Sequence, residues 1–276
     1  MSAVIMALAN QKGGVGKTAT TVNLAGVYQR KGLRTLVVDL DPQCHSTELL
    51  LHDSPPASKS LAAIFEEAPE FNASIIKSTR LTGLSVAPSC YDLAAITMEV
   101  YGRFDALRRL SAFFRHAEVD KNFDVVLIDC PPDLGIYTLN AISAARWIIT
   151  PCQPEAPAIT GFGFLASKIK TTQSFGVNVE HLGVIITMYD QRVSSQKEWV
   201  LNIMKTFDRR VLGQIHRAAQ INDAVDKGKL LSEVDRRARP YREHVRVAHE
   251  IALRTGIPWQ EDPTEDAENE PETGEV

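Results

Sequence analysis

The sequence predicts an α/β fold in which a doubly wound, mostly parallel sheet is flanked by helices. Short apolar runs rich in β-branched residues recur along the chain, and helix-length segments lie between most of them. The runs lack the polar alternation of a half-exposed strand, which suits central strands buried on both faces. Strands that alternate with helices indicate parallel pairing.

The expected elements can be placed in order. Strands are expected at residues 3–9, 34–40, 123–130, 146–152 and 182–188, with weaker candidates at 84–88 and 210–215. A helix is expected from Thr18 to Lys31, because Gly32 offers the left-handed conformation that ends many helices. Residues 52–60, HDSPPASKS, are expected to form a surface loop.

The composition is ordinary for a globular protein: of 276 residues, 44% are hydrophobic and 23% charged. No C-x-x-C pair occurs among the four cysteines, so neither a disulfide framework nor a zinc site is expected for Cys44, Cys90, Cys130 and Cys152. The first residues lack a basic region, and their apolar stretch is too short to span a bilayer. These features predict a reduced, cytoplasmic protein.

Charge divides the chain into two parts. The formal net charge is −4, but residues 260–276 carry eight acidic residues and no Lys or Arg. We expect this tail to be disordered and residues 1–259 to form one domain, because no linker divides them. Without the tail the chain is mildly basic. The excess of basic residues lies between Lys205 and Arg254, a segment that contains 12 basic and 7 acidic residues.

The segment KGGVGKT at residues 12–18 follows the first apolar run and opens the first expected helix. The strict phosphate-loop pattern G-x-x-x-x-G-K-[ST] fails, because Gln11 stands where its first glycine belongs. The three glycines can still turn successive N–H groups inward as an anion nest, and the helix adds the positive end of its dipole. A Gly-rich turn without a ligand is the alternative.

Two side chains after this nest have the chemistry of a nucleotide site. Lys17 can reach the β- and γ-phosphates, and the Thr18 hydroxyl can ligate Mg²⁺. We therefore predict a P-loop NTPase that binds a nucleotide and Mg²⁺. The expected nucleotide-binding residues of the loop are Gly13, Gly14, Val15, Gly16, Lys17, Thr18 and Ala19.

Three aspartates end two of the apolar runs. Asp39 and Asp41 alternate at the end of the second run and point the same way, so a cation or a polarised water is expected beside them. Asp129 follows four apolar residues, the position of a Walker B carboxylate that reaches Mg²⁺ through water. An acidic surface turn is the alternative for Asp129.

With these residues in view, KGGVGKT resembles the deviant Walker A motif of the ParA/Soj/MinD ATPases. DLDPQ at residues 39–43 is similar to switch I of that family, and DCPP at residues 129–132 is similar to its switch II. The resemblance covers about residues 3–254. It implies that Lys12 reaches the partner's phosphates across a dimer interface and that Asp41 orients the attacking water. The implied catalytic residues are Lys12, Lys17 and Asp41, and the implied metal residues are Thr18, Asp39 and Asp129.

The resemblance is weaker after residue 210. QIHRAAQINDA at residues 214–224 is similar to a family segment that packs against adenine, so His216 and Arg217 are implied nucleotide contacts. His216 replaces a proline of the family pattern, Gln220 replaces an arginine that contacts DNA in relatives, and Cys44 departs from the glycine after DPQ.

A DNA-binding surface is expected for two reasons. Arg192 matches a family position near the DNA-binding face, and the segment from Lys205 to Arg254 carries an excess of basic residues. The expected residues of this surface are Arg192, Arg217, Arg236, Arg237, Arg239, Arg242 and Arg246. If the segment after Pro240 is helical, Arg242 and Arg246 share one face, and the other three arginines of that run precede it in a turn. A solvated helix surface is the alternative.

The resemblance implies a partitioning ATPase of weak intrinsic activity. ATP would drive a homodimer that binds double-stranded DNA nonspecifically on the nucleoid, and a ParB-like adaptor would stimulate hydrolysis and release a plasmid or chromosome. The same ATPase could instead position a protein cargo such as a chemoreceptor cluster or carboxysome.

Two further interpretations stay open from the sequence. A MinD-like membrane ATPase needs a basic amphipathic C-terminal helix, whereas this tail is acidic. An iron–sulfur carrier of the related nitrogenase iron-protein type needs two cysteines per chain at the dimer axis. Cys130 follows Asp129 directly, and a packed thiol is the better interpretation of it.

Overall fold

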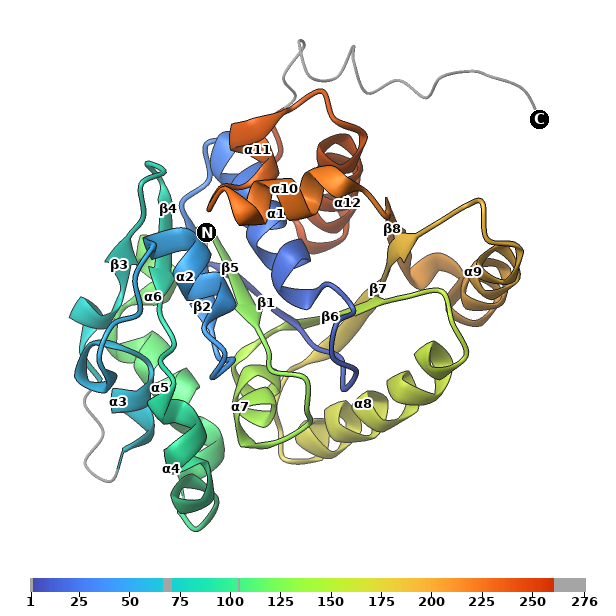
Figure 1. Ribbon diagram of the computed structural model, residues 1–276. Coiled ribbons are helices and arrows are strands. Elements are labelled where there is room, and N and C mark those ends of the chain that lie inside the picture. The colour runs from blue at the N-terminus through green and yellow to red at the C-terminus, as the bar shows by residue number, and fades with distance from the viewer. Residues whose placement is uncertain (1, 67–70, 104, 261–276) are drawn as a thin grey trace.

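The computed structural model describes residues 2–66, 71–103 and 105–260, whose strands form one eight-stranded sheet (Figure 1). The strand order is β3-β4-β2-β5-β1-β6-β7-β8, and every neighbouring pair is parallel except β3 with β4. The strands are β1 (Val4–Leu8), β2 (Thr35–Asp39), β3 (Lys77–Ser78), β4 (Leu84–Ala87), β5 (Val125–Asp129), β6 (Trp147–Cys152), β7 (Glu180–Tyr189) and β8 (Val211–His216).

The predicted α/β fold is confirmed, and all seven expected strands are present. The antiparallel edge strand β3 was missed, because two residues are too short to show a period of two. The tail prediction falls on residues 261–276, which lie outside the described ranges.

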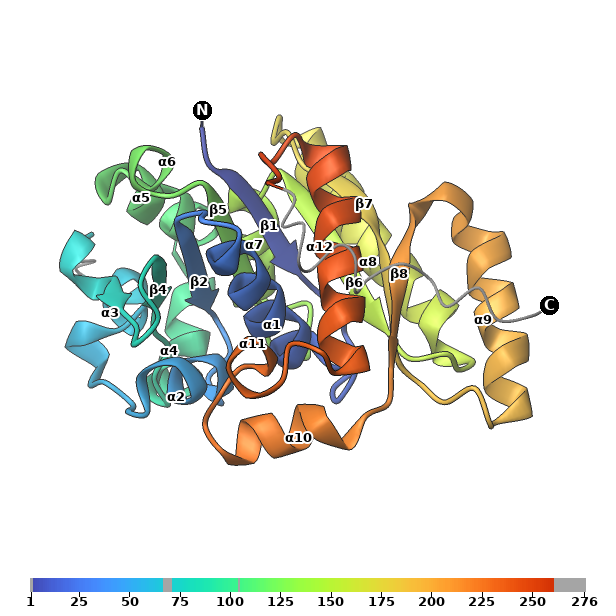
Figure 2. The ribbon, with the colours of Figure 1, turned by 90° about the horizontal axis from the view of Figure 1, so that it is seen from above.

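Helices cover both faces of the sheet (Figures 1 and 2). One face carries α1 (Lys17–Arg30), α10 (Ala219–Asp226), α11 (Leu231–Val234) and α12 (Arg239–Thr255), with α2 (His45–Leu51) beside them. The other carries α3 (Ala62–Phe65), α4 (Asp92–Tyr101), α5 (Arg109–His116), α6 (Val119–Asn122), α7 (Ile136–Ala144) and α8 (Pro157–Ser174). Helix α9 (Ser194–Phe207) lies beyond the edge strand β8.

The continuous apolar runs are explained by this double cover. Within β1, Met6 and Leu8 pack into the core beneath α1 and α12, whereas Ala7 packs into the core on the opposite face. All three side chains are fully buried. Successive strand residues point to opposite faces, so a strand with helices on both sides needs apolar residues at every position.

Two local expectations also hold. Helix α1 begins one residue before the expected Thr18 and ends at Arg30, and Gly32 has a φ of 78° in the left-handed region. Residues 52–60 lie mostly at the surface, with one turn of 3₁₀ helix at Ala57–Lys59.

The register brings the predicted carboxylates to one edge. Asp129 at the end of β5 pairs with Leu8 of β1 on one side and with Asp39 of β2 on the other. The loop that follows β1 therefore lies beside both aspartates. Ligands of doubly wound sheets bind at this carboxyl edge.

Candidate functional site

The glycine-rich loop has the backbone geometry of an anion nest. Gly14 and Gly16 have φ values of 70° and 82°, which side chains with a Cβ rarely adopt. Gly16 ends the loop as the N-cap of α1 and has no side-chain cap, so the first N–H groups of the helix face outward. Neighbouring strands hold the loop, since Thr187 Oγ1 donates to the Val15 carbonyl at 2.7 Å and Gln153 Nε2 to the Gly14 carbonyl at 3.0 Å.

Lys17 lies at the base of this loop. It is 6% exposed, and its ammonium donates to the Lys12 carbonyl at 3.2 Å. Burial lowers the pKa of Lys17, and the neighbouring Asp129 carboxylate opposes that shift most strongly. A buried ammonium with one carbonyl partner lacks compensation, and a phosphate supplies it.

Lys12 is compensated within the same chain. Its ammonium lies 2.5 Å from a carboxylate oxygen of Glu155, three residues after β6. Asn10 fixes the backbone beneath, because its side chain accepts from the Lys12 N–H at 3.0 Å and donates to the Pro151 carbonyl at 2.8 Å. The Lys12 side chain is 42% exposed, so it can leave Glu155 without breaking the core.

Asp39 and Asp129, which end β2 and β5, differ in the hydrogen bonds that they accept. Asp39 accepts from Thr47 N at 2.9 Å, Thr47 Oγ1 at 2.7 Å and Asp41 N at 3.1 Å, and so ties α2 to the sheet. Asp129 Oδ2 accepts from Ser46 Oγ at 2.7 Å, but Oδ1 is buried with no hydrogen-bond partner in the described part of the chain.

That bare oxygen is the feature that fits a magnesium site. Burial raises the pKa values of both Asp39 and Asp129, and the negative charge of Asp129 adds to the shift of Asp39. The Thr18 hydroxyl lowers the pKa of Asp129, although it does not reach hydrogen-bonding geometry with Oδ1. A cation or its bound water would satisfy Oδ1 and offset the repulsion between the two carboxylates.

Nowhere in the described ranges do three or more His, Cys, Asp or Glu side chains gather as a ready-made metal cage. Mg²⁺ does not require one, because it keeps several waters and is bound by one or two carboxylates together with substrate phosphates. The bare oxygen of Asp129 is therefore the group that fits the ion.

Asp41 lies just beyond β2 and is 8% exposed. Its Oδ1 accepts from the Gln43 N–H at 2.9 Å, which fixes the side chain at the carboxyl edge. No described residue bonds its second oxygen. The aspartate is thus positioned by the turn that it caps, with one oxygen available to a ligand or water.

The ends of β7 and β8 lie on the other side of the loop. His216 Nδ1 is 2.7 Å from Glu243 Oε1, and its ring packs on Tyr189 with centroids 4.8 Å apart. Arg217 N donates to the Tyr189 carbonyl at 2.9 Å. His216 and Arg217 are therefore at the carboxyl edge, as expected, but separated from Asp39 and Asp129 by the strands between.

The arginines expected to contact DNA lie in several separate segments near the carboxyl end of the sheet. Arg192 and Arg217 follow β7 and β8, and Arg236 and Arg237 lie exposed in the turn before α12. Arg192 is paired with Asp190 at 2.7 Å and its side chain is 85% exposed. These positions share the carboxyl end of the sheet with the first turn of α12.

The position expected for Arg239 was wrong. It begins α12 instead of preceding it, because Pro240 fits the first helical turn and Arg239 Nε reaches Glu243 one turn later at 2.8 Å. The segment after Pro240 is helical as expected. Arg239, Arg242 and Arg246 follow one face of it, on which Arg242 is half-buried.

Several site residues were missed from the sequence. Glu155 and Gln153 follow β6, Thr187 lies two residues before the end of β7, and Ser46 and Thr47 lie in the first turn of α2. Their one available signal was position, since polar residues just after parallel strands collect at the carboxyl edge.

Cys130 is packed, as the sequence favoured. It is 1% exposed, and burial raises the pKa of its thiol well above the usual value. None of the helices in the described ranges is long and apolar enough to cross a membrane.

Together, the fold and this edge define a P-loop nucleoside triphosphatase. A family model described as an AAA domain matches residues 3–180. The chain is 32% identical over 251 residues to the sporulation initiation inhibitor protein Soj of Bacillus subtilis, covering 90% of this chain and 98% of Soj. It belongs to the ParA/Soj-type partitioning ATPases.

Solved structures of other proteins share this fold. The ATP complex of a Cyanothece McdA variant shares the fold with a TM-score of 0.82 at 19% identity, covering 95% of this chain and 99% of that one. A structure described as cobyrinic acid a,c-diamide synthase from Mycobacterium smegmatis with bound ADP and magnesium has a TM-score of 0.73 at 27% identity. It covers 94% of this chain and 100% of that one. Structural neighbours of this chain thus hold adenine nucleotides, in some cases with magnesium.

Proposed function

We propose that the protein hydrolyses ATP weakly on its own and uses the cycle to partition DNA. The observation that carries this proposal is that a buried Lys17 ammonium and the unpartnered Oδ1 of Asp129 occur at the same sheet edge. Nucleotide phosphates compensate the first group, and hydrated Mg²⁺ suits the second. Thr18, Asp39 and Asp129 would hold that ion, which neutralises charge on the phosphates when bound.

The orientation of the nucleotide follows from the strand order. The metal-side carboxylates lie on β2 and β5, whereas Tyr189, His216 and Arg217 lie at the ends of β7 and β8, across β1 and β6. With the phosphates in the loop after β1, the γ-phosphate faces Asp39 and Asp129. The adenine then points towards His216 and Arg217.

Hydrolysis in this arrangement needs a positioned water and charge on the phosphates. The second oxygen of Asp41 is available to orient the water, because Gln43 N occupies only the first. Lys17 supplies charge from its own chain. Lys12 supplies it to a second copy of the chain, which makes activity depend on dimerisation.

The DNA-binding part of the proposal rests on the basic groups at the same end of the sheet. Arg192, Arg217, Arg236, Arg237 and the α12 arginines would contact phosphates without reading bases, since backbone contacts carry no sequence information. A dimer doubles these contacts, so ATP controls binding. The protein would then act in the cytoplasm on the nucleoid, with a ParB-like adaptor accelerating hydrolysis.

Light scattering with a phosphate-release assay tests the nucleotide cycle. The full chain with Mg²⁺ and ATP is expected to double in mass and to turn over slowly, whereas ADP leaves a monomer. Lys12→Gln should bind ATP but neither dimerise nor hydrolyse. A normal ATP-dependent dimer in this variant would remove Lys12 from the interface.

A pull-down from the native host then identifies the adaptor. A DNA-bound adaptor supports partition of a plasmid or chromosome. An adaptor embedded in a protein assembly supports the alternative, in which the same ATPase positions a protein cargo.

A further inference from the structure

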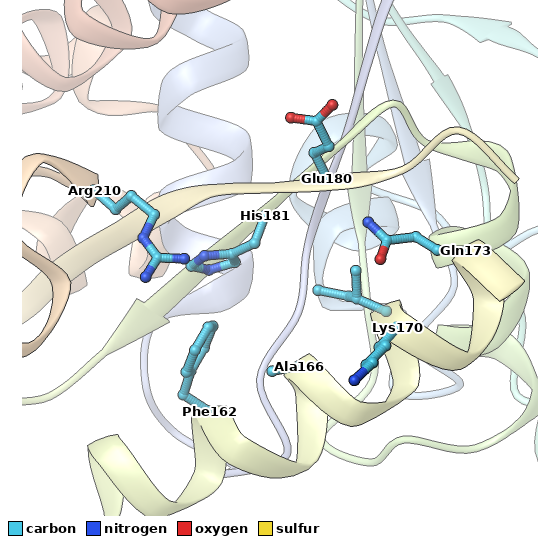
Figure 3. A pocket seen from close by; sticks show the side chains of 8 residues that line it. Phe162, Ala166, Lys170, Gln173, Glu180, His181 and Arg210 are labelled. Carbon is cyan, nitrogen blue, oxygen red and sulfur yellow. The ribbon is translucent and has the colours of Figure 1, made fainter.

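A cavity of about 420 Å³ opens between α8 and the start of β7, at the end of the sheet opposite the nucleotide loop (Figure 3). Its apolar wall consists of Phe162, Ala166 and Ile169 from α8. The volume lies within the range of small-molecule sites, which are mostly apolar with a few placed polar groups. Nothing in the proposed ATPase cycle uses this cavity.

His181 supplies an unsatisfied polar group to the cavity lining. Its Nε2 lies 3.0 Å from Thr150 Oγ1, but Nδ1 is buried without a hydrogen-bond partner in the described part of the chain. Burial, and then the charge of Arg210, lowers the pKa of His181 to about 4, so the ring is neutral near pH 7. A buried nitrogen left in this state is destabilising. The neutral ring lies 4.5 Å from the Phe162 ring, centroid to centroid, and so extends the aromatic wall.

Two basic residues, Arg210 and Lys170, belong to the lining of this cavity. Figure 3 shows the Arg210 guanidinium beside the His181 ring, whereas Lys170 lies on α8 across the cavity lining, with its ammonium directed away from Arg210. Among the described residues, neither cation has an acidic partner. The one acidic lining residue, Glu180, is 2.6 Å from Arg146 and is thereby neutralised. The lining thus carries excess positive charge next to an aromatic wall.

We propose that this cavity binds a small organic anion with a flat apolar body, such as an aryl carboxylate or aryl phosphate. The body packs against Phe162 and Ile169, and the anionic group contacts the Arg210 guanidinium. The apolar wall and the Arg210 guanidinium are both needed, so neither a neutral arene nor inorganic phosphate satisfies the site.

The test uses the full chain without nucleotide, with benzoate, phenyl phosphate, benzamide and inorganic phosphate as probes. NMR follows the His181 imidazole resonances during each titration. Benzoate or phenyl phosphate should shift them saturably, with benzamide and inorganic phosphate each about tenfold weaker, the scale of one charge-assisted contact. Absence of saturation with both aryl anions would overturn the site, as would equal binding of inorganic phosphate.

Matched variants separate the cavity from general surface charge. Arg210→Ala should weaken binding of the aryl anion about tenfold while leaving benzamide binding unchanged. Lys170→Ala, which removes a more distant charge of the lining, should weaken it less. Lys168→Ala removes an exposed lysine from the same helix without touching the cavity and should have no effect. An equal loss in all three variants would show a nonspecific cationic surface and refute the proposal.

Discussion

The Lys12 ammonium lies 2.5 Å from the Glu155 carboxylate, although 143 residues separate the two along the chain. Their side chains are 42% and 37% exposed. An exposed ion pair of this kind contributes about 1 kcal/mol or less, so it holds Lys12 in place without locking it. If Lys12 serves the partner's nucleotide, this contact must open when two chains meet.

Glu155→Gln is therefore expected to favour the ATP-bound dimer. Removing the carboxylate leaves Lys12 no intrachain competitor, which should tighten dimerisation up to about fivefold. Light scattering across a protein dilution series measures the change. Glu198→Gln, an exposed site on α9, is the control and should behave as wild type. Weaker dimerisation in Glu155→Gln would show that Glu155 acts in the dimer itself.

Lys17→Ala is expected to abolish measurable ATP binding. The buried ammonium is the main point charge beneath the loop, and a charged phosphate left without it loses its strongest contact. Calorimetry with ATP tests this, with exposed Lys59→Ala as the control. Unchanged ATP affinity would place the phosphates elsewhere.

Asp41→Ala is expected to trap the ATP-bound dimer. The glycine nest and Lys17 stay intact, while the attacking water loses its orienting carboxylate. Phosphate release should fall by about 10²-fold or more, the scale of a lost general-base or positioning group, while the dimer persists. Turnover at the wild-type rate would move the role to another residue, with Asp39 next in line.

His181 is expected to make folding stability fall in mild acid. Its pKa is about 4 in the folded chain against 6.5 unfolded, so below pH 6.5 the unfolded state binds more protons. Stability is therefore lost as pH falls from about 6.5 towards about 4. Between pH 7.5 and pH 5 the loss should approach about 2 kcal/mol.

Urea unfolding of the wild type and His181→Gln measures this loss at the two pH values. The variant should lose about 2 kcal/mol less than the wild type over that interval, because other buried groups titrate in both proteins. Exposed His45→Gln is the control and should match the wild type. An equal pH dependence in wild type and His181→Gln would refute the assignment.

The sequence was sufficient for the parts of this protein that are local. KGGVGKT lies between a strand and a helix, and VVLID ends in Asp129, so periodicity and spacing located the loop and its carboxylate. The Lys12–Glu155 pair joins the ends of β1 and β6, which only strand order makes neighbours. Thr47 likewise donates a hydrogen bond to Asp39 only because α2 folds back on β2. Arg239 was misplaced because a proline in the first helical turn resembles a break.

ATP-controlled DNA binding is tested most directly by fluorescence anisotropy on unrelated duplexes, with Mg²⁺ and either ATP or ADP, across a salt series. We predict binding with ATP alone, without sequence preference, weakening by about 0.9 log units per log unit of salt for each phosphate contacted. Changing Arg236, Arg237, Arg239 and Arg242 to Ala should weaken it, whereas Arg115→Ala on α5 should not. Binding indifferent to ATP, or unchanged in the fourfold variant, would contradict the proposed function.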